Sequence, residues 1–440
     1  MIVMKFGGTS VGNAKRIRNV ANIVKYYIKK KPVVVVSAVT KITDSLIKLA
    51  NECAQGKGNE TLEVIKNNHY KILQQLKIEK SLLDNDIREL IHLVAETKSN
   101  QYINAEILDH FQSFGERMSP KIVAEKLNKI GVKAKAFNAW ELGFLTDSEF
   151  GNAEPLEIVY PNLKSSIKKL NIVPVITGFI GKTEQGDITT LGRGGSDYTA
   201  AIIGVAINAD EIQIWTDVDG IMSTDPKIVS TAKTLDKGSF AEASELAYFG
   251  ARGLHPKTIM PAMEKGIPVK VLNSFNPKNK STTILNKANK NKHMVKSIAY
   301  KKNITLINIE SSRMLGAYGF LARVFDIFDE YRKSIDVVST SEVSVSLTVD
   351  NDENVENILR ELKEIAEVNI LKNKAIICVV GEGMRHTPGI AGKTFTVLGR
   401  NKINIEMISQ GASEINITFI VDQKNAEKAV KVLHKKYFGG

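Results

Sequence analysis

The chain has 440 residues, of which 43% are hydrophobic and 25% charged, as expected for a soluble globular protein of two or three domains. The net charge is +12, but the basic residues are mostly lysines spread along the whole chain, which argues against nucleic-acid binding. No apolar run approaches the roughly 20 residues of a membrane-spanning helix, and two distant cysteines argue against a zinc site or a disulfide framework.

The N-terminus starts directly on an apolar run and lacks the charged and apolar regions of a signal peptide, so we expect a cytoplasmic protein. Residues 1–285 alternate β-rich runs with helical stretches, which predicts an α/β fold: an open, mostly parallel sheet with helices on both faces. A helical pattern from Glu60 to Phe114 predicts an insertion on this core. The expected strands are Ile2–Phe6, Val33–Ser37, Val173–Thr177, Ile212–Thr216 and Val269–Leu272, and the expected helices include Ala14–Lys30, Pro120–Lys129 and Tyr198–Asn208.

Two glycines follow the first expected strand, in the segment Lys5–Ser10. Gly7 and Gly8 allow backbone N–H groups to approach an anion closely, and Lys5 adds a cation beside them. The segment is neither a Walker A loop nor a dinucleotide fingerprint. Taken alone, an ordinary tight turn is an equally good interpretation.

A second glycine-rich segment, Thr189–Ala201, surrounds Arg193 with three glycines and leads into an apolar helix. We expect Ser196 to cap that helix, whose N-terminus and free N–H groups favour a negatively charged ligand. Arg193 can bind a carboxylate through two hydrogen bonds. A flexible turn with an incidental arginine is the alternative interpretation.

A third polar segment, Asp217–Gly220, follows the strand that ends at Thr216. The carboxyl ends of strands form the usual ligand-binding edge of an open α/β sheet. Calcium is disfavoured because the further oxygen ligands of an EF-hand are missing, so a nucleotide contact is the better interpretation. His255 is more typical of a packed turn than of a catalytic base.

Beyond a polar boundary at Asn286–Met294, the chain contains an internal repeat. The segment Ser341–Asp350 matches Ser413–Asp422, and the offset is 72 residues (413 − 341). Each copy shows the periodicities of a ferredoxin-like βαββαβ module of about 70 residues. The repeat predicts helices at Gly319–Tyr331 and Pro388–Arg400.

Taken together, these segments resemble the amino-acid kinase family, and within it the aspartate kinases, along nearly the entire chain. The Lys5–Ser10 start, the glycine loop around Arg193, the Thr216–Ile221 strand end and the Leu254–Pro256 turn occur in the family's order. The duplicated modules resemble paired ACT modules, which sense ligands. The resemblance implies an amino-acid kinase domain at 1–285, a linker at 286–297, and ACT modules at 298–368 and 369–440 whose strands can interleave.

The resemblance also implies a function: ATP-dependent phosphorylation of the side-chain carboxylate of L-aspartate to 4-phospho-L-aspartate, the first step of lysine, threonine and methionine biosynthesis. It implies ATP with Mg²⁺ as cofactors, feedback inhibition by lysine, and a homodimer or dimer of dimers formed through the ACT modules. Because a carboxylate is already ionised at pH 7, such a site needs positioning and charge neutralisation and no general base. The alternatives are another amino-acid kinase, or a non-catalytic amino-acid sensor that keeps a kinase-like shell.

The roles that the resemblance implies fall on matching positions. The catalytic residues would be Lys5, Gly7, Gly8 and Asp197. The L-aspartate pocket would comprise Ser37, Ala38, Thr43, Glu116, Phe179, Arg193 and Ser196, with Glu116 facing the α-ammonium and Arg193 the α-carboxylate. ATP would contact Thr216, Asp217, Met222, Lys227 and Arg252, although Met222 and Lys227 replace a tyrosine and an arginine common in the family.

The lysine effector would bind in the first module, with Asp336 and Glu342 neutralising its ammonium groups and backbone N–H groups near Gly319 holding its carboxylate. The alternative is a pair of modules that only dimerise. The effector residues implied by the resemblance are Met314, Ala317, Tyr318, Gly319, Phe320, Ile335, Asp336, Thr340, Ser341 and Glu342, with Ala317 in place of a frequent serine.

Overall fold

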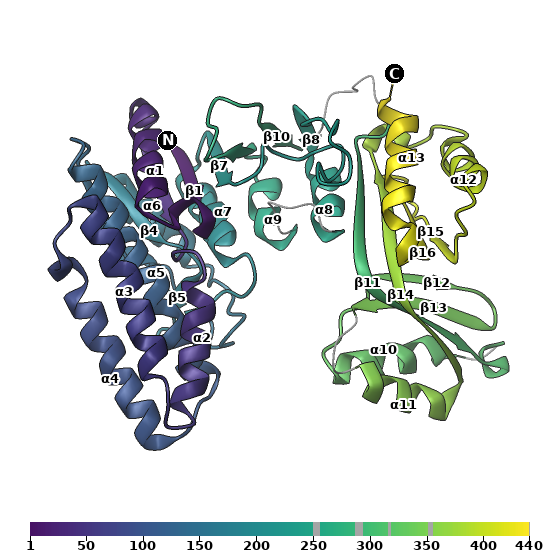
Figure 1. The fold of residues 1–440 in the computed structure, drawn as a ribbon, viewed down its shortest axis with the longest axis horizontal. Coiled ribbons are helices and arrows are strands. Elements are labelled where there is room, and N and C mark those ends of the chain that lie inside the picture. The colour runs from purple at the N-terminus through teal and green to yellow at the C-terminus, as the bar shows by residue number, and fades with distance from the viewer. Residues whose placement is uncertain (250–255, 287–293, 316–317, 351–354, 440) are drawn as a thin grey trace. The chain divides into compact units, whose positions relative to one another are not determined.

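A computed structural model of the chain describes all residues except 250–255, 287–293, 316–317, 351–354 and 440 (Figure 1). The chain forms two compact units. The second unit takes in two short stretches that come early in the sequence, Met222–Lys233 and Ala241–Ala251. The first unit comprises Met1–Ile221, Thr234–Phe240 and Arg252–Lys287, and the rest of the second is Ala288–Gly440.

The first unit is built on an eight-stranded sheet with the order β3-β4-β2-β1-β7-β9-β10-β8. The central strand β1 (Ile2–Phe6) pairs in parallel with β2 (Pro32–Val36) and β7 (Glu211–Thr216). All pairs are parallel except β9 with β10, which confirms the predicted open, mostly parallel sheet. The other strands are β3 (Ala134–Phe137), β4 (Val173–Thr177), β8 (Lys237–Ser239), β9 (Val269–Asn273) and β10 (Thr282–Leu285).

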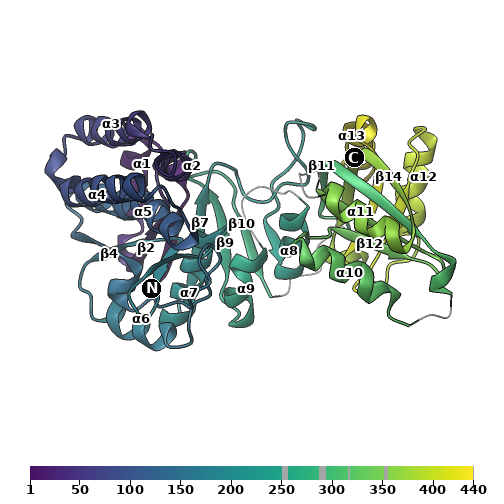
Figure 2. The ribbon, with the colours of Figure 1, turned by 90° about the horizontal axis from the view of Figure 1, so that it is seen from below.

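The sheet lies between two layers of helices (Figures 1 and 2), and alternate residues of β1 face different layers. Ile2, Met4 and Phe6 belong to the core shared with the helices of the N-terminal half, whereas Val3 points to the layer of α7, near Gly204. Burial on both faces explains why these strands are continuously apolar. The first layer contains α1 (Ala14–Tyr26), α2 (Ile42–Cys53) and α5 (Ala105–Asn128), and the second contains α6 (Val159–Lys168), α7 (Gly195–Ile207) and α9 (Pro256–Glu264).

The predicted helical insertion consists of α3 (Asn59–Leu76) and α4 (Asp84–Asn100), which pack with α2 and α5 (Figure 2). A separate helix beginning at Pro120 was the wrong expectation, because α5 continues through this proline to Asn128. Proline lacks the N–H that would bond the carbonyl of Glu116 four residues earlier. The helix nevertheless continues, since its flanking residues Ser119 and Ile122 are held in the core.

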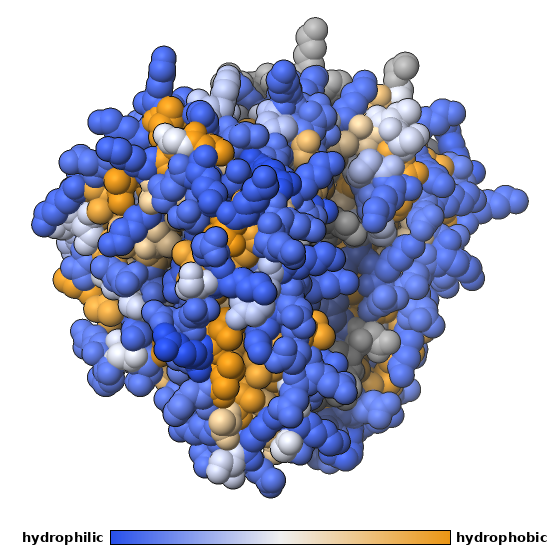
Figure 3. Space-filling view, turned by 60° about the vertical axis from the view of Figure 1, so that its left-hand side comes forward, coloured by the Kyte–Doolittle hydropathy of each residue, from blue (hydrophilic) through white to orange (hydrophobic). Residues whose placement is uncertain are grey.

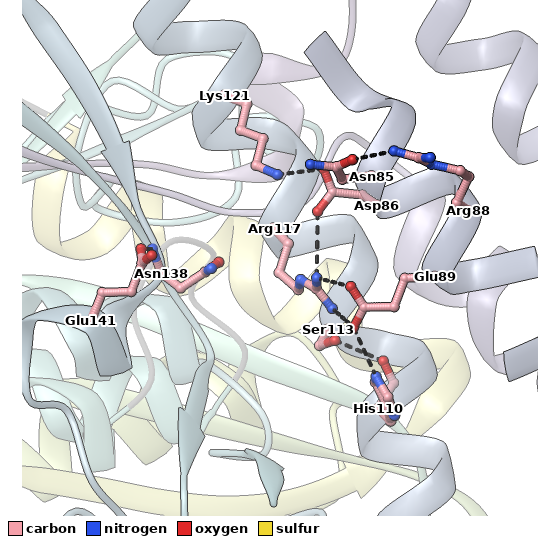
Figure 4. A network of polar contacts seen from close by, with 10 residues as sticks. All are labelled: Asn85, Asp86, Arg88, Glu89, His110, Ser113, Arg117, Lys121, Asn138 and Glu141. Atoms are coloured by element: carbon pink, nitrogen blue, oxygen red, sulfur yellow. Dashed lines mark hydrogen bonds and ion pairs between the residues drawn. The ribbon is translucent and has the colours of Figure 1, made fainter. Parts of the chain in front are cut away.

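A network of ion pairs joins α4 to α5 (Figure 4). Asp86 on α4 is 1% exposed, and its carboxylate pairs with Lys121 at 2.5 Å and with Arg117 at 3.5 Å. Arg117 also holds Glu89 with both terminal nitrogens, and His110 lies 3.5 Å from the same glutamate. The network therefore attaches α4 to α5.

The second unit contains a six-stranded sheet with the order β12-β13-β11-β14-β16-β15. Two long strands, β11 (Ser297–Glu310) and β14 (Glu367–Val380), pair antiparallel along both halves of their length. The C-terminal half of β11 also pairs with β13 (Ser344–Asp350), and that of β14 with β16 (Asn416–Asp422). The two repeats therefore share their central strands.

Each repeat keeps its own hydrophobic core in the second unit, over opposite halves of the long strands. The helices predicted at Gly319–Tyr331 and Pro388–Arg400 are confirmed within two residues as α10 and α12. The remaining elements of this unit are α8 (Phe240–Tyr248), α10 (Phe320–Glu330), β12 (Val337–Thr340), α11 (Val355–Ile365), α12 (Ile390–Arg400), β15 (Met407–Ser409) and α13 (Ala426–Phe438).

The face shown in Figure 3 is mainly hydrophilic, with apolar patches between hydrophilic residues. Such patches are normal for globular proteins. In the part of the chain that the structure describes, no helix combines the length and the apolar character needed to cross a membrane.

We predict that Asp86→Asn lowers the free energy of unfolding by about 2 kcal/mol, because it leaves Lys121 and Arg117 without their buried counter-charge. Urea denaturation followed by circular dichroism would measure this loss. The matched control is Glu63→Gln, which removes an exposed pair with Lys66 and should cost less than about 1 kcal/mol. Equal stability of the two variants would contradict a stabilising role for the network.

Candidate active site

A cavity of about 640 Å³ lies at the carboxyl ends of β1, β2 and β4 in the first unit. This is the edge where open parallel sheets bind ligands. The cavity is bounded by the starts of α2 and α7 and by one side of α5. It brings together most of the residues predicted for catalysis and for aspartate, namely Lys5, Gly8, Ser37, Ala38, Thr43, Glu116, Phe179, Arg193 and Ser196.

Lys5 enters the cavity from β1 and pairs with Asp197 of α7, with 2.6 Å between Nζ and Oδ1. Both side chains are about nine-tenths buried, so this charge pair is little screened by water. The N–H of Gly7 donates to the carbonyl of Trp215 on the neighbouring strand at 3.2 Å. A side chain at Gly8 would lie 2.9 Å from the carbonyl oxygen of Ala38, so this close approach of two strand ends requires glycine.

Glu116 of α5 is 3% exposed. Its Oε1 accepts a hydrogen bond from the N–H of Ala38 at 2.9 Å, and its Oε2 has no partner among the described residues. Burial raises the pKa of Glu116 to about 8, against the opposing effects of the Ala38 hydrogen bond and the charge of Lys5. A cation that entered the cavity would therefore favour the ionised form of this carboxyl.

The glycine-rich loop differs from the prediction at Ser196, which does not cap the helix. Helix α7 begins at Gly195, and its N-cap is Gly194, two residues before the predicted cap; the φ of 80° at Gly194 is easily reached only by glycine. Ser196 lies in the first turn and packs against Gly178, where an added Cβ would be 2.5 Å from the serine Cβ. The adjacent Phe179 has a φ of 67°, an uncommon conformation for an aromatic residue and one often found at functional sites.

Arg193 lines the same cavity from the tip of this loop, and its side chain is exposed. Among the described residues it forms no ion pair. The cavity therefore presents an unpaired guanidinium from one wall and a buried, half-satisfied carboxyl, that of Glu116, from another.

Several lining residues were missed by the sequence analysis. Those at the start of α2 follow directly on Ala38, so the rule that ligand sites lie at strand ends could have found them. Gln112 lies four residues before Glu116, and helical spacing could have placed it on the same face. Thr190 lies in the glycine-rich segment identified from the sequence but was given no role there, whereas Gly151 reaches the cavity through tertiary contacts that no local pattern reveals. The missed residues include Thr40, Lys41, Asp44, Ile47, Gln112, Gly151 and Thr190.

The residues predicted to contact ATP are brought together only in part. Thr216 and Asp217 lie at the end of β7 in the first unit, where Ser274 donates to the carbonyl of Thr216. Met222 and Lys227 belong to the second compact unit. Arg252 lies outside the described residues.

The predicted effector residues form two groups in the second unit. Met314, Tyr318, Gly319 and Phe320 surround the start of α10, and Ala317 lies outside the described residues. Gly319 has a φ of 80° and forms the N-cap of this helix. The second group lies at β12 and the turn to β13, and consists of Ile335, Asp336, Thr340, Ser341 and Glu342.

Asp336 already has a cationic partner in this structure. The Nζ of Lys301 lies 2.9 Å from Asp336 and 2.9 Å from Asp350, and the hydroxyl of Tyr248 donates to Asp336 at 3.1 Å. Burial and the charge of Asp336 raise the pKa of Tyr248 to about 12. The acid predicted to bind the effector's ammonium is thus neutralised by a lysine of the chain itself.

The second repeat contains the equivalent group. Lys374 pairs with Glu406 at 2.7 Å and lies 4.0 Å from Asp422. Glu406 and Asp422 stand 70 and 72 residues after Asp336 and Asp350 (406 − 336 and 422 − 350). Each repeat therefore contains its own lysine between two acids.

Comparison with known proteins supports the assignment of these parts. The model of the amino acid kinase family matches residues 1–273, and that of an ACT domain matches residues 377–437. The chain is 42% identical to aspartokinase 1, chloroplastic, of Arabidopsis thaliana over 99% of its length and 80% of that protein. It is 37% identical to the lysine-sensitive aspartokinase 3 of Escherichia coli, over 100% of this chain and 99% of that one.

Solved structures show the same similarity. Aspartokinase III of E. coli in complex with aspartate and ADP aligns with a TM-score of 0.85 at 35% identity, covering 100% of both chains. The same enzyme with lysine and aspartate aligns with a TM-score of 0.84 at 36% identity, covering 100% of this chain and 99% of that one. The chain belongs to the amino acid kinase family, in the group of aspartokinases that carry ACT domains.

No group of three or more His, Cys, Asp or Glu side chains that could hold a metal ion is found among the described residues. The acidic side chains at the cavity, Asp44, Glu116 and Asp197, lie on different elements.

We predict that Glu116 makes stability fall with rising pH. In the folded state its carboxyl stays protonated up to its pKa of about 8, whereas in the unfolded chain it ionises near pH 4.5. The protonated Glu116 carboxyl therefore contributes its full stabilisation below pH 4.5, its pKa in the unfolded chain, and this stabilisation is lost as the pH rises through about 8. Relative to wild type, Glu116→Gln should gain about 2–4 kcal/mol in unfolding free energy between pH 5 and pH 9.

Urea denaturation at both pH values measures this difference. Glu106→Gln, on the exposed part of the same helix, serves as the control and should change little between them. A constant difference between Glu116→Gln and wild type at both pH values would show that Glu116 is ionised throughout.

Proposed function

We propose that this chain transfers the terminal phosphoryl group of ATP to the side-chain carboxylate of L-aspartate, giving 4-phospho-L-aspartate and ADP. The observation that carries the proposal is that Glu116 and Arg193 line the same cavity, which is also lined by Lys5. Such a cavity suits a free α-amino acid, which carries one positive and one negative group. The complex of E. coli aspartokinase III with aspartate and ADP supports the same substrates.

The α-ammonium of L-aspartate would bind Glu116, whose Oε2 lacks a partner among the described residues. A bound cation stabilises the ionised carboxyl and so lowers its pKa. Arg193 would hold the α-carboxylate through two parallel hydrogen bonds. With both α groups fixed, the side-chain carboxylate is left to face Lys5, while Ser37, Ala38, Thr43, Phe179 and Ser196 complete the pocket.

The reaction needs no base, because the attacking carboxylate is ionised at neutral pH. One carboxylate oxygen forms a bond to phosphorus while the bond from phosphorus to the bridging oxygen of ADP breaks. Lys5 would neutralise charge on the transferring phosphoryl group. Asp197 would hold Lys5 in place through the 2.6 Å ion pair.

Mg²⁺ would accompany ATP on the phosphate oxygens, where a divalent ion neutralises charge in phosphoryl transfer. Asp197 is the buried carboxylate nearest to Lys5 and could add an oxygen ligand. Thr216 and Asp217 would contact the nucleotide from the end of β7, with Met222, Lys227 and Arg252 as further proposed contacts.

We predict that the purified protein, with ATP and Mg²⁺, phosphorylates L-aspartate in preference to L-glutamate and N-acetylglutamate. The acyl phosphate can be trapped with hydroxylamine and ADP release followed by a coupled assay. N-acetylglutamate lacks the α-ammonium, so it cannot pair with Glu116. Absence of turnover with aspartate would refute the proposal, and a preference for another acceptor would replace it with a different amino-acid kinase.

The matched variants for this assay are Lys5→Ala and Lys29→Ala. Lys5→Ala should reduce turnover at least roughly 100-fold, because it removes stabilisation of transition-state charge. Lys29 is an exposed lysine outside the cavity, so Lys29→Ala should leave turnover near wild type.

We also propose that lysine inhibits the enzyme through the first ACT repeat. The lysine-sensitive relative of E. coli and its complex with lysine support this effector. A lysine ammonium would then compete with Lys301 for Asp336, since both are primary ammonium groups. The exposed Tyr318 and the helix N-terminus at Gly319 offer contacts for the rest of the molecule.

We predict that Asp336→Asn weakens inhibition by lysine at least about 10-fold, the size of one lost charge-assisted hydrogen bond. Uninhibited turnover should remain close to wild type. Glu406→Gln alters the equivalent acid of the second repeat and should keep lysine sensitivity. The inhibition constants of the two variants are measured in assays with increasing lysine and compared with that of the wild type. Equal lysine sensitivity of both variants would place the effector elsewhere.

We further propose a cytoplasmic enzyme that forms a homodimer or a dimer of dimers. Exposed apolar side chains on α10, Leu321 and Phe325, and the edge strand β12 support pairing through the first repeat.

A further inference from the structure

Asp109 is a buried carboxylate in the first unit that takes no part in the mechanism above. The residue is 1% exposed. One oxygen, Oδ2, accepts from the N–H of Gly151 and from the N–H of Thr190, each at 2.8 Å. The other, Oδ1, accepts from the hydroxyl of Thr190 at 2.7 Å. Three donors thus converge on one side chain, which favours its ionised form although burial raises the pKa of Asp109.

On one side, Asp109 belongs to the helix that carries the proposed ammonium-binding residue. It lies on α5, roughly two helical turns before Glu116, with Gln112 between them. Gln112 and Glu116 line the cavity, whereas Asp109 itself does not. The carboxylate is therefore rigidly connected to Glu116 without reaching the bound substrate.

On the other side, the partners of Asp109 support the loop that carries Arg193. Thr190 ends β6 (Ile188–Thr190), three residues before Arg193, and its carbonyl accepts from the N–H of Ala153 at 2.9 Å. The loop then rests on the turn at Gly151. A side chain at Gly192 would lie 3.2 Å from the carbonyl oxygen of Gly151 and 2.8 Å from the Oδ1 of Asn152.

We propose that Asp109 is a positioning residue for the amino-acid acceptor. By tying α5 to Gly151 and Thr190, it fixes the distance between Glu116 and Arg193, and so the places of the α-ammonium and the α-carboxylate. The inference rests on the proposed function and extends it to a residue that touches neither substrate nor nucleotide. An ionised carboxylate suits this task because its two oxygens accept all three bonds and need donate none.

The test compares Asp109→Ala with wild type by steady-state kinetics in aspartate and in ATP. We expect kcat/KM for aspartate to fall about 100-fold, through both a higher KM and a lower kcat, because small misplacements of a reacting group have effects of this size. The KM for ATP should stay within about twofold, since the nucleotide contacts lie on other elements. Calorimetric titration with L-aspartate should show the weaker binding without turnover.

Asp86→Asn is the matched control. Asp86 is as buried as Asp109 and also bonds α5, but its partners Lys121 and Arg117 lie away from the cavity. This variant should lose stability and keep the wild-type KM for aspartate. A purely structural role of Asp109 would make the two variants behave alike.

Two milder variants keep the test decisive if Asp109→Ala does not fold. Asp109→Asn retains one acceptor oxygen, and Thr190→Val removes only the hydroxyl donor. Both should raise the aspartate KM by less than Asp109→Ala, about 3–10-fold, the cost of one buried hydrogen bond.

The proposal is overturned if folded Asp109 variants keep the wild-type KM and kcat for aspartate, or if the KM values for aspartate and ATP rise together. Failure of the proposed function would appear separately, as an inactive wild-type protein or one with a different acceptor. If the wild type uses a different acceptor, the same variants are assayed with that acceptor.

Discussion

The burial of a carboxyl at Glu116 is the constraint on which the candidate site depends. A carboxyl with one hydrogen bond and a desolvated second oxygen is costly in the charged form, and its raised pKa expresses that cost. A ligand that supplies a positive group relieves the penalty. Under the proposed function, selectivity for a free amino group would follow from this cost, because an acceptor without that group leaves the Glu116 carboxylate uncompensated.

Several polar contacts hold the elements around Glu116 together. Ion pairs of Arg117 and Lys121 with Asp86 and Glu89 attach α5 to α4 (Figure 4). Toward the cavity, the N–H of Ala38 ties the carboxyl to the end of β2. Lys5 is likewise fixed by Asp197. Charges held in this way need little rearrangement during reaction, which is the condition for electrostatic catalysis.

Sequence patterns predicted the parts of this site that are local. The strand ends after β1 and β2 and the glycine loop before α7 carry motifs whose chemistry is visible in a few consecutive residues. Ser196 was placed wrongly as a cap because Gly194 can adopt a left-handed conformation and start the helix earlier. Pro120 suggested a helix start, yet burial of its neighbours overrides the lost hydrogen bond. Asp109 and Thr190 are 81 residues apart (190 − 109), so only the fold could bring them together.

The repeat shows a further limit of sequence patterns. The family resemblance implied Asp336 and Glu342 as the acids that bind an effector. Lys301 and Lys374 stand outside the matched segments of the repeat, so no local pattern places them beside Asp336 and Glu406. In the structure each lysine neutralises the corresponding acid of its repeat. The copies differ among the described residues, because Asp336 also accepts from Tyr248 at the end of α8, whereas the second oxygen of Glu406 has no partner. A ligand that displaced Lys301 would therefore bind an acid that also contacts α8, whereas a ligand that displaced Lys374 from Glu406 would not.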